Sequence, residues 1–107
     1  MRRSLALLAV LAVLGALAAA SAFAATAHVT VNDDFFKRNS VTIRKGSSVT
    51  WTWQGKRRHN VTAVSGPVRF HSRTQRRGTF TKRFTRRGLY SISCTLHPGM
   101  DMKVRVR

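Results

Sequence analysis

The feature that most constrains this chain is a group of soft metal-binding side chains near its C-terminal end. The only cysteine, Cys94, is followed three residues later by His97, and the methionines Met100 and Met102 come next. A thiolate, an imidazole and a thioether within one short segment form a soft ligand set, and soft sulfur ligands select copper. Two histidines, one cysteine and a weak axial methionine form a blue-copper site. The segment therefore predicts a copper site for which a second imidazole must come from elsewhere.

Three further histidines could supply that imidazole, and their surroundings differ. His59 begins an alternating segment and shares one face of the expected strand with the apolar Val61. His28 lies in an alternating strand and is expected to be exposed, although it becomes a candidate ligand if the chain is cleaved just before it. His71 lies among polar loop residues and is expected to be solvated.

The remainder of the chain has the pattern of short β-strands. Several segments alternate with a period of two and are rich in β-branched and aromatic residues, whereas none beyond the N-terminal region has a helical apolar period. The expected strands cover residues 28–31, 41–44, 48–53, 59–64, 78–84, 89–94 and 103–107, with 68–70 as a further short strand. Roughly seven strands separated by glycine-marked turns predict an all-β fold, an antiparallel β-sandwich.

The same alternation predicts which side chains form the core, because alternate residues of a strand point to the same face. The inward-facing residues expected from it are Val49, Trp51, Trp53, Tyr90, Ile92 and Cys94. Of the neighbours Phe35 and Phe36, one ring is expected to be buried.

The N-terminal residues have the layout of a secretory signal peptide. Arg2 and Arg3 give a positive start, residues 5–20 are almost entirely leucine, alanine and valine, and small residues follow. Cleavage after Ala24, or alternatively after Ala27, is expected, so that residues 1–24 form the signal peptide and residues 25–107 the copper-binding domain. Retention as a membrane anchor is the other interpretation, because a bilayer is spanned by about 20 apolar residues. Either way the domain is exported, to the periplasm, the cell surface or the extracellular space.

A single cysteine cannot form an internal disulfide, which is the usual staple of small exported domains. The domain without its signal is near the lower size limit for a self-sufficient core, and such domains are often stabilised by a metal ion. The lone cysteine is therefore expected to be a metal ligand, with a reactive thiol or an intermolecular bridge as the alternatives.

The chain is strongly basic, with 20 Lys and Arg against three acidic residues and a net charge of +17. Loss of Arg2 and Arg3 with the signal peptide leaves two positive charges fewer, +15. Such a field attracts anionic partners and surfaces. Basic runs at 56–58, 76–77, 82–83 and 86–87 indicate either attraction to an acidic redox partner or to an anionic cell envelope, or merely a solvated basic surface.

A histidine at a strand start, a cysteine ending the penultimate strand, and a histidine and methionine before the last strand follow the order of the cupredoxin family, which the chain resembles. The matching segments are 46–53, 59–63, 88–90 and 94–100, within a resemblance that covers residues 29–106. The chain is most similar to the amicyanin and plastocyanin-like branch, with its Cys-x-x-His-x-x-Met or Cys-x-x-His-x-x-x-x-Met loop. The resemblance implies a Greek-key sandwich and the copper ligands His59, Cys94, His97 and Met100. Met102, which fits the longer spacing, is the alternative axial ligand.

The resemblance also implies a tie between the two ligand-bearing segments. In the family, the asparagine after the first histidine bonds to the residue after the cysteine, and Asn60 and Thr95 stand at these positions. Pro98 and Gly99 are expected to restrict the loop that follows His97.

Other interpretations of Cys94 stay open. A buried free cysteine can simply be a small hydrophobic residue. A zinc site is a second possibility, although one cysteine, two histidines and a thioether are not its usual ligands. A Cys–His hydrolase would need an orienting group and an oxyanion hole, for which the sequence offers no residue set. The ligand spacing of His97 and Met100 favours copper over all three.

The function implied by the resemblance is electron transport rather than enzymatic catalysis. One type 1 copper ion would carry single electrons between redox proteins, with His97 as the exit. The surrounding apolar patch is expected to contain Leu96, Pro98 and Gly99, with Phe36 and Val64 as further candidates. The expected partner is a redox protein with an acidic docking surface, and the chain is expected to be a monomer without a specific nucleic-acid target.

Two alternative functions stay open. A copper storage or delivery protein would use the same ligands without a redox partner. A basic module that binds envelope polymers or nucleic acid non-specifically would need no copper, because lysine and arginine attract phosphate in any case.

Overall fold

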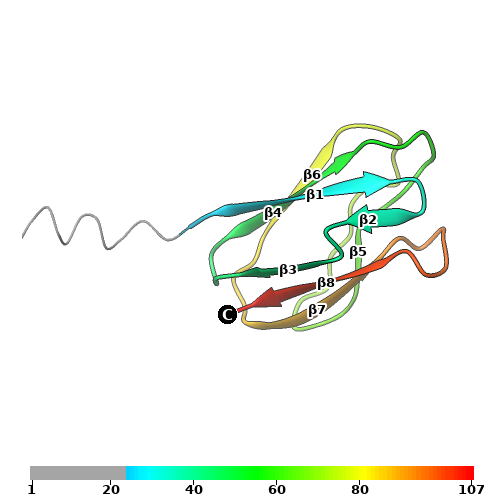
Figure 1. Ribbon diagram of the computed structural model, residues 1–107. Coiled ribbons are helices and arrows are strands. Elements are labelled where there is room, and N and C mark those ends of the chain that lie inside the picture. Colours follow the sequence, from blue (N-terminus) through cyan, green and yellow to red (C-terminus); the bar gives the residue numbers. More distant parts are fainter. Residues whose placement is uncertain (1–23) are drawn as a thin grey trace, which may run out of the picture.

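Eight strands with alternating buried and exposed side chains build two sheets that pack face to face (Figure 1). The structure is a computed structural model and describes residues 24–107. The first sheet has the order β2-β1-β4-β6, with strands β2 (Phe35–Lys37), β1 (Thr26–Asn32), β4 (Ser48–Trp53) and β6 (Thr79–Arg83). The second has the order β3-β8-β7-β5, with strands β3 (Ser40–Ile43), β8 (Asp101–Val106), β7 (Gly88–Ser93) and β5 (Thr62–Ser65).

The core lies between the sheets and follows the period-two pattern. Every second residue of β4 is buried, and the same holds for β8. All six residues that the alternation predicts to face inward belong to the buried cluster. Phe84 and Tyr90 pack edge to face with ring centroids 5.0 Å apart, and the Tyr90 hydroxyl donates a 2.8 Å hydrogen bond to the Arg86 carbonyl oxygen. The aromatic core therefore also closes the turn between β6 and β7.

The predicted all-β sandwich is confirmed, with differences in its details. There are eight strands rather than about seven, because the three-residue β2 pairs with β1, whereas residues 68–70 form no strand. The sheets are not purely antiparallel, since β1 pairs with β4 and β3 with β8 in parallel. Parallel neighbours need a crossover connection, and here the chain passes from β2 into the second sheet and returns at β4.

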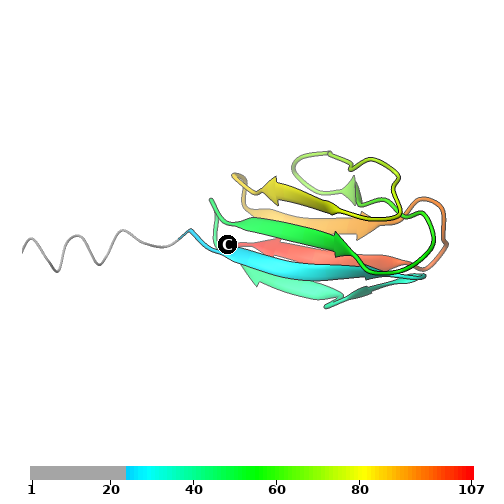
Figure 2. The same ribbon diagram turned by 90° about the horizontal axis from the view of Figure 1, so that it is seen from above.

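The strand directions give the sandwich two ends. We call the end with the turn after β1, the segment after β4 and the β7–β8 loop the ligand pole. The far pole holds the β3–β4 turn, the β6–β7 turn, the end of β8 and the start of β1, where the described chain begins. Both views place these groups at opposite ends of the strands (Figures 1 and 2).

The expected signal peptide, apart from Ala24, lies outside the described residues, and its cleavage stays a prediction. Within residues 24–107, no helix has the length and apolar character needed to cross a bilayer.

The register of β2 can be tested with its two phenylalanines. Phe36 is 3% exposed, whereas Phe35 is 52% exposed. Phe36→Ala in the copper-free protein is expected to lower the free energy of unfolding by about 3–5 kcal/mol, because a buried ring is lost. Phe35→Ala is the matched control and should change it by less than about 0.5 kcal/mol. Urea denaturation measures both, and equal losses would contradict the register.

Candidate metal centre

The structure brings three of the predicted ligands together at the ligand pole. Ligand atoms of His59, Cys94 and His97 all lie within 4.8 Å of one another. The Cys94 Sγ atom is 3.9 Å from His59 Nδ1 and 3.6 Å from His97 Nδ1. The other two histidines, His28 and His71, do not join this group; both are exposed, as expected.

These distances fit a shared metal ion. With bond lengths of about 2.1 Å to nitrogen and about 2.3 Å to sulfur, ligands about 120° apart around one ion are separated by about 3.8 Å. The two observed sulfur–nitrogen separations, 3.6 and 3.9 Å, lie on either side of this value. One thiol and two imidazoles therefore face a point where a copper ion can contact all three.

His59 lies outside regular strand structure, in the connection between β4 and β5. The predicted strand over residues 59–64 is wrong at its start, because β5 begins only at Thr62. Instead, His59 forms an isolated bridge with Gln75, with two backbone hydrogen bonds of 3.0 Å. The Trp53 indole Nε1 also donates to the His59 carbonyl oxygen at 3.1 Å. These bonds hold the backbone of a residue that is completely buried.

Cys94 and His97 lie on a loop closed by its own backbone. The Cys94 amide donates to the Met100 carbonyl oxygen at 3.0 Å, and the Met100 amide donates to that of His97 at 3.2 Å. Gly99 has a φ of +84°, a left-handed conformation that glycine adopts without strain. The expected tightening of this loop thus depends on Gly99. Glycine is needed there because of the backbone conformation alone.

The two methionines are placed differently. Met100 lies opposite Cys94, one step beyond the Ser93–Asp101 pair of the β7–β8 ladder. Met102 pairs with Ile92 deeper in the sandwich, and its sulfur accepts a 3.2 Å hydrogen bond from Trp51 Nε1. Both side chains are buried, but only Met100 adjoins the cysteine in the ladder.

Asn60 joins the two ligand-bearing segments. Its side chain donates to Thr95 Oγ1 at 2.8 Å and accepts from the Thr95 backbone amide at 3.1 Å. It also bonds Thr74 Oγ1 and Thr62 Oγ1, at 3.2 and 2.8 Å. The segment carrying His59 is therefore tied directly to the residue that follows Cys94.

A residue that the sequence interpretation missed orients His59. Asp33 Oδ1 lies 2.9 Å from His59 Nε2 and also accepts hydrogen bonds from the backbone amides of Lys56 and Arg57. The bond to His59, followed by those two amides, holds the pKa of the Asp33 carboxyl group well below its usual range. An ionised carboxylate can only accept, so the proton sits on Nε2 and the Nδ1 lone pair faces Cys94.

The neighbouring carboxylate lies beside the other histidine. Asp34 Oδ1 is 3.5 Å from His97 Nε2, and the other Asp34 oxygen pairs with Arg57 at 3.3 Å. The β1–β2 turn thus places one carboxylate near each imidazole. The sequence does hold a signal for the role of Asp33 and Asp34. They are two of only three acidic residues in a strongly basic chain.

Gly55 shows how closely Asp33 is packed. A Cβ atom added at Gly55 would lie 2.7 Å from Asp33 Cγ, well inside van der Waals contact. The carboxylate can therefore occupy this position only because residue 55 has no side chain.

Exposure separates the two imidazoles. His59 is fully buried, whereas the His97 side chain is 24% exposed. Leu96, next to His97, is 50% exposed. Phe36, a candidate for the surrounding apolar patch, is buried in the core, and the exposed ring that follows Asp34 is that of Phe35.

A family model described as copper binding proteins, plastocyanin/azurin family, matches residues 24–107. The chain belongs to the plastocyanin/azurin family of copper-binding proteins. Copper is accordingly the cofactor of this cupredoxin, and its histidines, cysteine and methionine have the residue types and placement of a type 1 site. Its amicyanin-like relatives are small non-enzymatic electron carriers, as the sequence interpretation expected.

Solved structures agree with this assignment. Amicyanin in a reduced Cu(I) form is 26% identical and superimposes with a TM-score of 0.69 over 77% of this chain and 82% of that one. A purple cupredoxin from Nitrosopumilus maritimus is 23% identical, with a TM-score of 0.68 over 76% of this chain and 99% of that one.

A larger protein shares the fold as one part of its chain. The copper-containing nitrite reductase of Thermus scotoductus SA-01 is 22% identical with a TM-score of 0.70; the match covers 77% of this cupredoxin but spans only 22% of the reductase. Sequence comparison with curated proteins gives no match.

The role of Asp33 can be tested by copper affinity. Asp33→Ala is expected to weaken copper binding about 10–100-fold, because the His59 ring loses the partner that orients it. Competition with a chelator measures the affinity. Asp101→Ala is the matched control, since it removes the same charge from the start of β8, where the carboxylate bonds only Ser93 among the described contacts. An equal loss in both variants would show that charge, rather than orientation, matters.

Proposed function

We propose that this cupredoxin is an exported carrier of single electrons whose type 1 copper ion is held by His59, Cys94, His97 and Met100. The observation that carries this is the placement of the Cys94 sulfur 3.9 and 3.6 Å from two imidazole Nδ1 atoms, one of them buried and the other at the surface. When bound, copper supplies a one-electron couple between Cu(II) and Cu(I).

The residues of the chain would keep the site dry and its geometry constant. His59, Cys94 and Met100 are all buried, so water is kept from three of the four groups. Backbone hydrogen bonds fix both segments, and Asn60 ties one to the other. A site that cannot rearrange suits an ion that changes oxidation state without changing ligands.

His97 would be the exit for the electron. Its partly exposed ring lies next to the exposed Leu96, so a partner can approach the site through a small apolar area. Weak, short-lived redox encounters use interfaces of this small kind. The exposed Lys56, Arg57 and Arg58 precede His59 and favour a redox partner with an acidic docking surface.

Export, and hence a periplasmic, cell-surface or extracellular location, rests on the N-terminal sequence. Copper storage or delivery is the second candidate function, since it needs the same ligands. A binding module without copper is disfavoured by the convergence of the three ligand atoms.

The site type can be tested with cupric ion. Addition to the purified protein is expected to give intense visible absorption, because a copper-bound thiolate is a strong chromophore, and Cys94→Ser should abolish it. Cys94→Ser must stay folded by circular dichroism for this comparison. Weak absorption from both proteins would reject a type 1 site.

The same copper-loaded protein separates a carrier from a storage protein. A carrier should retain copper against a chelator in both oxidation states and should be reduced rapidly and reversibly by a one-electron donor. Release of copper on reduction would favour storage or delivery and reject electron transport.

The axial ligand can be tested with Met100→Leu and Met102→Leu. Replacement of Met100 is expected to shift the visible spectrum and the reduction potential, because its sulfur would be lost from the site. Replacement of Met102 should leave both nearly unchanged and instead lower stability by about 1 kcal/mol, because the Trp51 indole loses its acceptor. The reverse pattern would assign Met102.

A further inference from the structure

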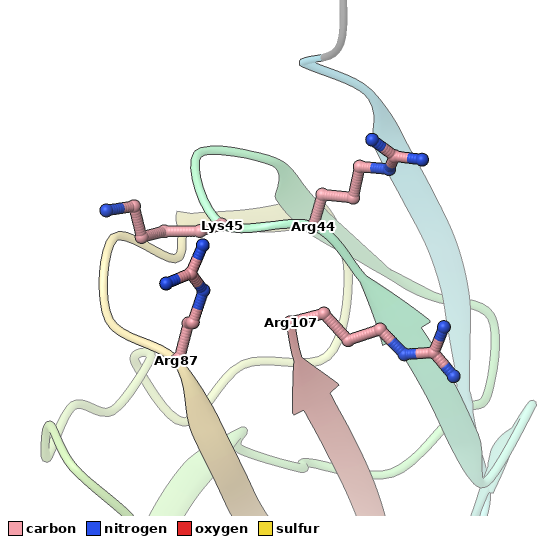
Figure 3. Close-up of a pocket in the computed structure, with 4 residues that line it drawn as sticks. All are labelled: Arg44, Lys45, Arg87 and Arg107. Atoms are coloured by element: carbon pink, nitrogen blue, oxygen red, sulfur yellow. The ribbon is translucent and has the colours of Figure 1, made fainter.

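Four basic residues lie close together at the far pole, away from the metal centre. They line one hollow of about 400 Å³ and are Arg44, Lys45, Arg87 and Arg107. Figure 3 shows them extending from the β3–β4 turn, the start of β7 and the end of β8, with the Arg87 guanidinium beside Lys45 and the Arg44 and Arg107 side chains extending to the other side. Two more arginines flank them, since Arg83 donates to the Gly46 carbonyl oxygen and Arg86 to that of Pro67.

The acidic side chains of the chain lie at the other pole. The chain has three acidic residues, Asp33, Asp34 and Asp101. The first two lie in the β1–β2 turn beside the histidines, and the third begins β8 next to the ligand loop. All three therefore lie at the ligand pole. Like charges held close together repel one another, so the far pole favours an anionic counterpart.

The chain enters the domain at this same pole. The Ala25 amide donates to Ser47 Oγ at 3.3 Å, and the Ser48 amide donates to the Ala25 carbonyl oxygen at 2.9 Å. The described chain thus begins beside the β3–β4 turn that carries Arg44 and Lys45. The inference rests on the proposed export: the far pole is the end of the domain that directly follows the apolar N-terminal sequence, and it would be the part nearest to the membrane as the chain emerges.

We propose that the far pole docks on the anionic phospholipid surface of the membrane, with lipid phosphates between Lys45, Arg87 and Arg107. The ligand pole, at the other end of the strands, then faces away from the bilayer, and the exposed edge of His97 stays open to soluble partners. This docking depends on charge and on the place of chain entry, and it does not require bound copper.

Vesicle binding by the full chain tests the proposal. Vesicles of phosphatidylcholine alone are compared by cosedimentation with vesicles of equal parts phosphatidylcholine and phosphatidylglycerol. Binding should be tighter to the anionic vesicles, and the preference should shrink as salt is added. Each Lys or Arg at an anionic surface strengthens binding about fivefold, so Lys45→Gln with Arg87→Gln should weaken binding to anionic vesicles roughly thirtyfold. Binding to phosphatidylcholine should not change.

The matched control carries the same charge change at the ligand pole. Arg76→Gln with Arg77→Gln alters two exposed side chains between Gln75, which bridges His59, and Gly78, whose carbonyl oxygen accepts from Trp53. This variant should keep most of the affinity, and circular dichroism confirms that both variants fold. Three results would overturn the proposal: equal binding to both vesicle types, equal losses in both variants, or full displacement by inorganic phosphate at constant ionic strength.

Discussion

The hydrogen bond between the Asp33 carboxylate and the His59 ring is the contact on which the metal centre depends. His59 is fully buried, so its ring cannot be oriented by water and must find its partners within the protein. The carboxylate accepts a hydrogen bond from Nε2–H and leaves Nδ1 directed at Cys94. Two backbone amides hold the carboxylate, and Gly55 leaves room for it. The β1–β2 turn of the first sheet thereby orients His59, which precedes β5 of the second sheet.

The other half of the centre depends on the ladder between β7 and β8. Cys94 and Met100 face each other where this ladder ends, and His97 lies on the loop between them. The loop can be short because its ends are hydrogen-bonded neighbours. Asn60 then joins it to the His59 segment, so the two halves of the site are linked by side-chain bonds that need no metal.

Charge is distributed unevenly along the length of the sandwich. The three aspartates lie at the ligand pole, where two of them are close to the histidines. The far pole carries three arginines and a lysine around a hollow. Net charge says little about fold, but its placement decides which end attracts which surface. This placement underlies the two roles proposed above, electron exchange at one end of the domain and membrane attachment at the other.

The sequence by itself determined the class of fold and most of the candidate ligands. The alternation of Val49, Trp51 and Trp53 is a local property, because these side chains share one face whichever strands pair with theirs. The core could therefore be predicted. The spacing of Cys94, His97 and Met100 is likewise local, because a single loop carries them. The identification of His59 as a ligand needed the family resemblance, since 35 residues separate it from Cys94.

Only the tertiary structure decided which partners meet. Alternation shows the face of a residue but not its neighbour, so the parallel pairing of β1 with β4 was beyond prediction. The same limit hid the bond of Asp33 to His59, across 26 residues, and the use of the Met102 sulfur by Trp51. It also hid the basic hollow, whose residues come from three separate places in the chain. Such contacts depend on how the chain crosses between the two sheets, and local sequence patterns do not predict these crossings.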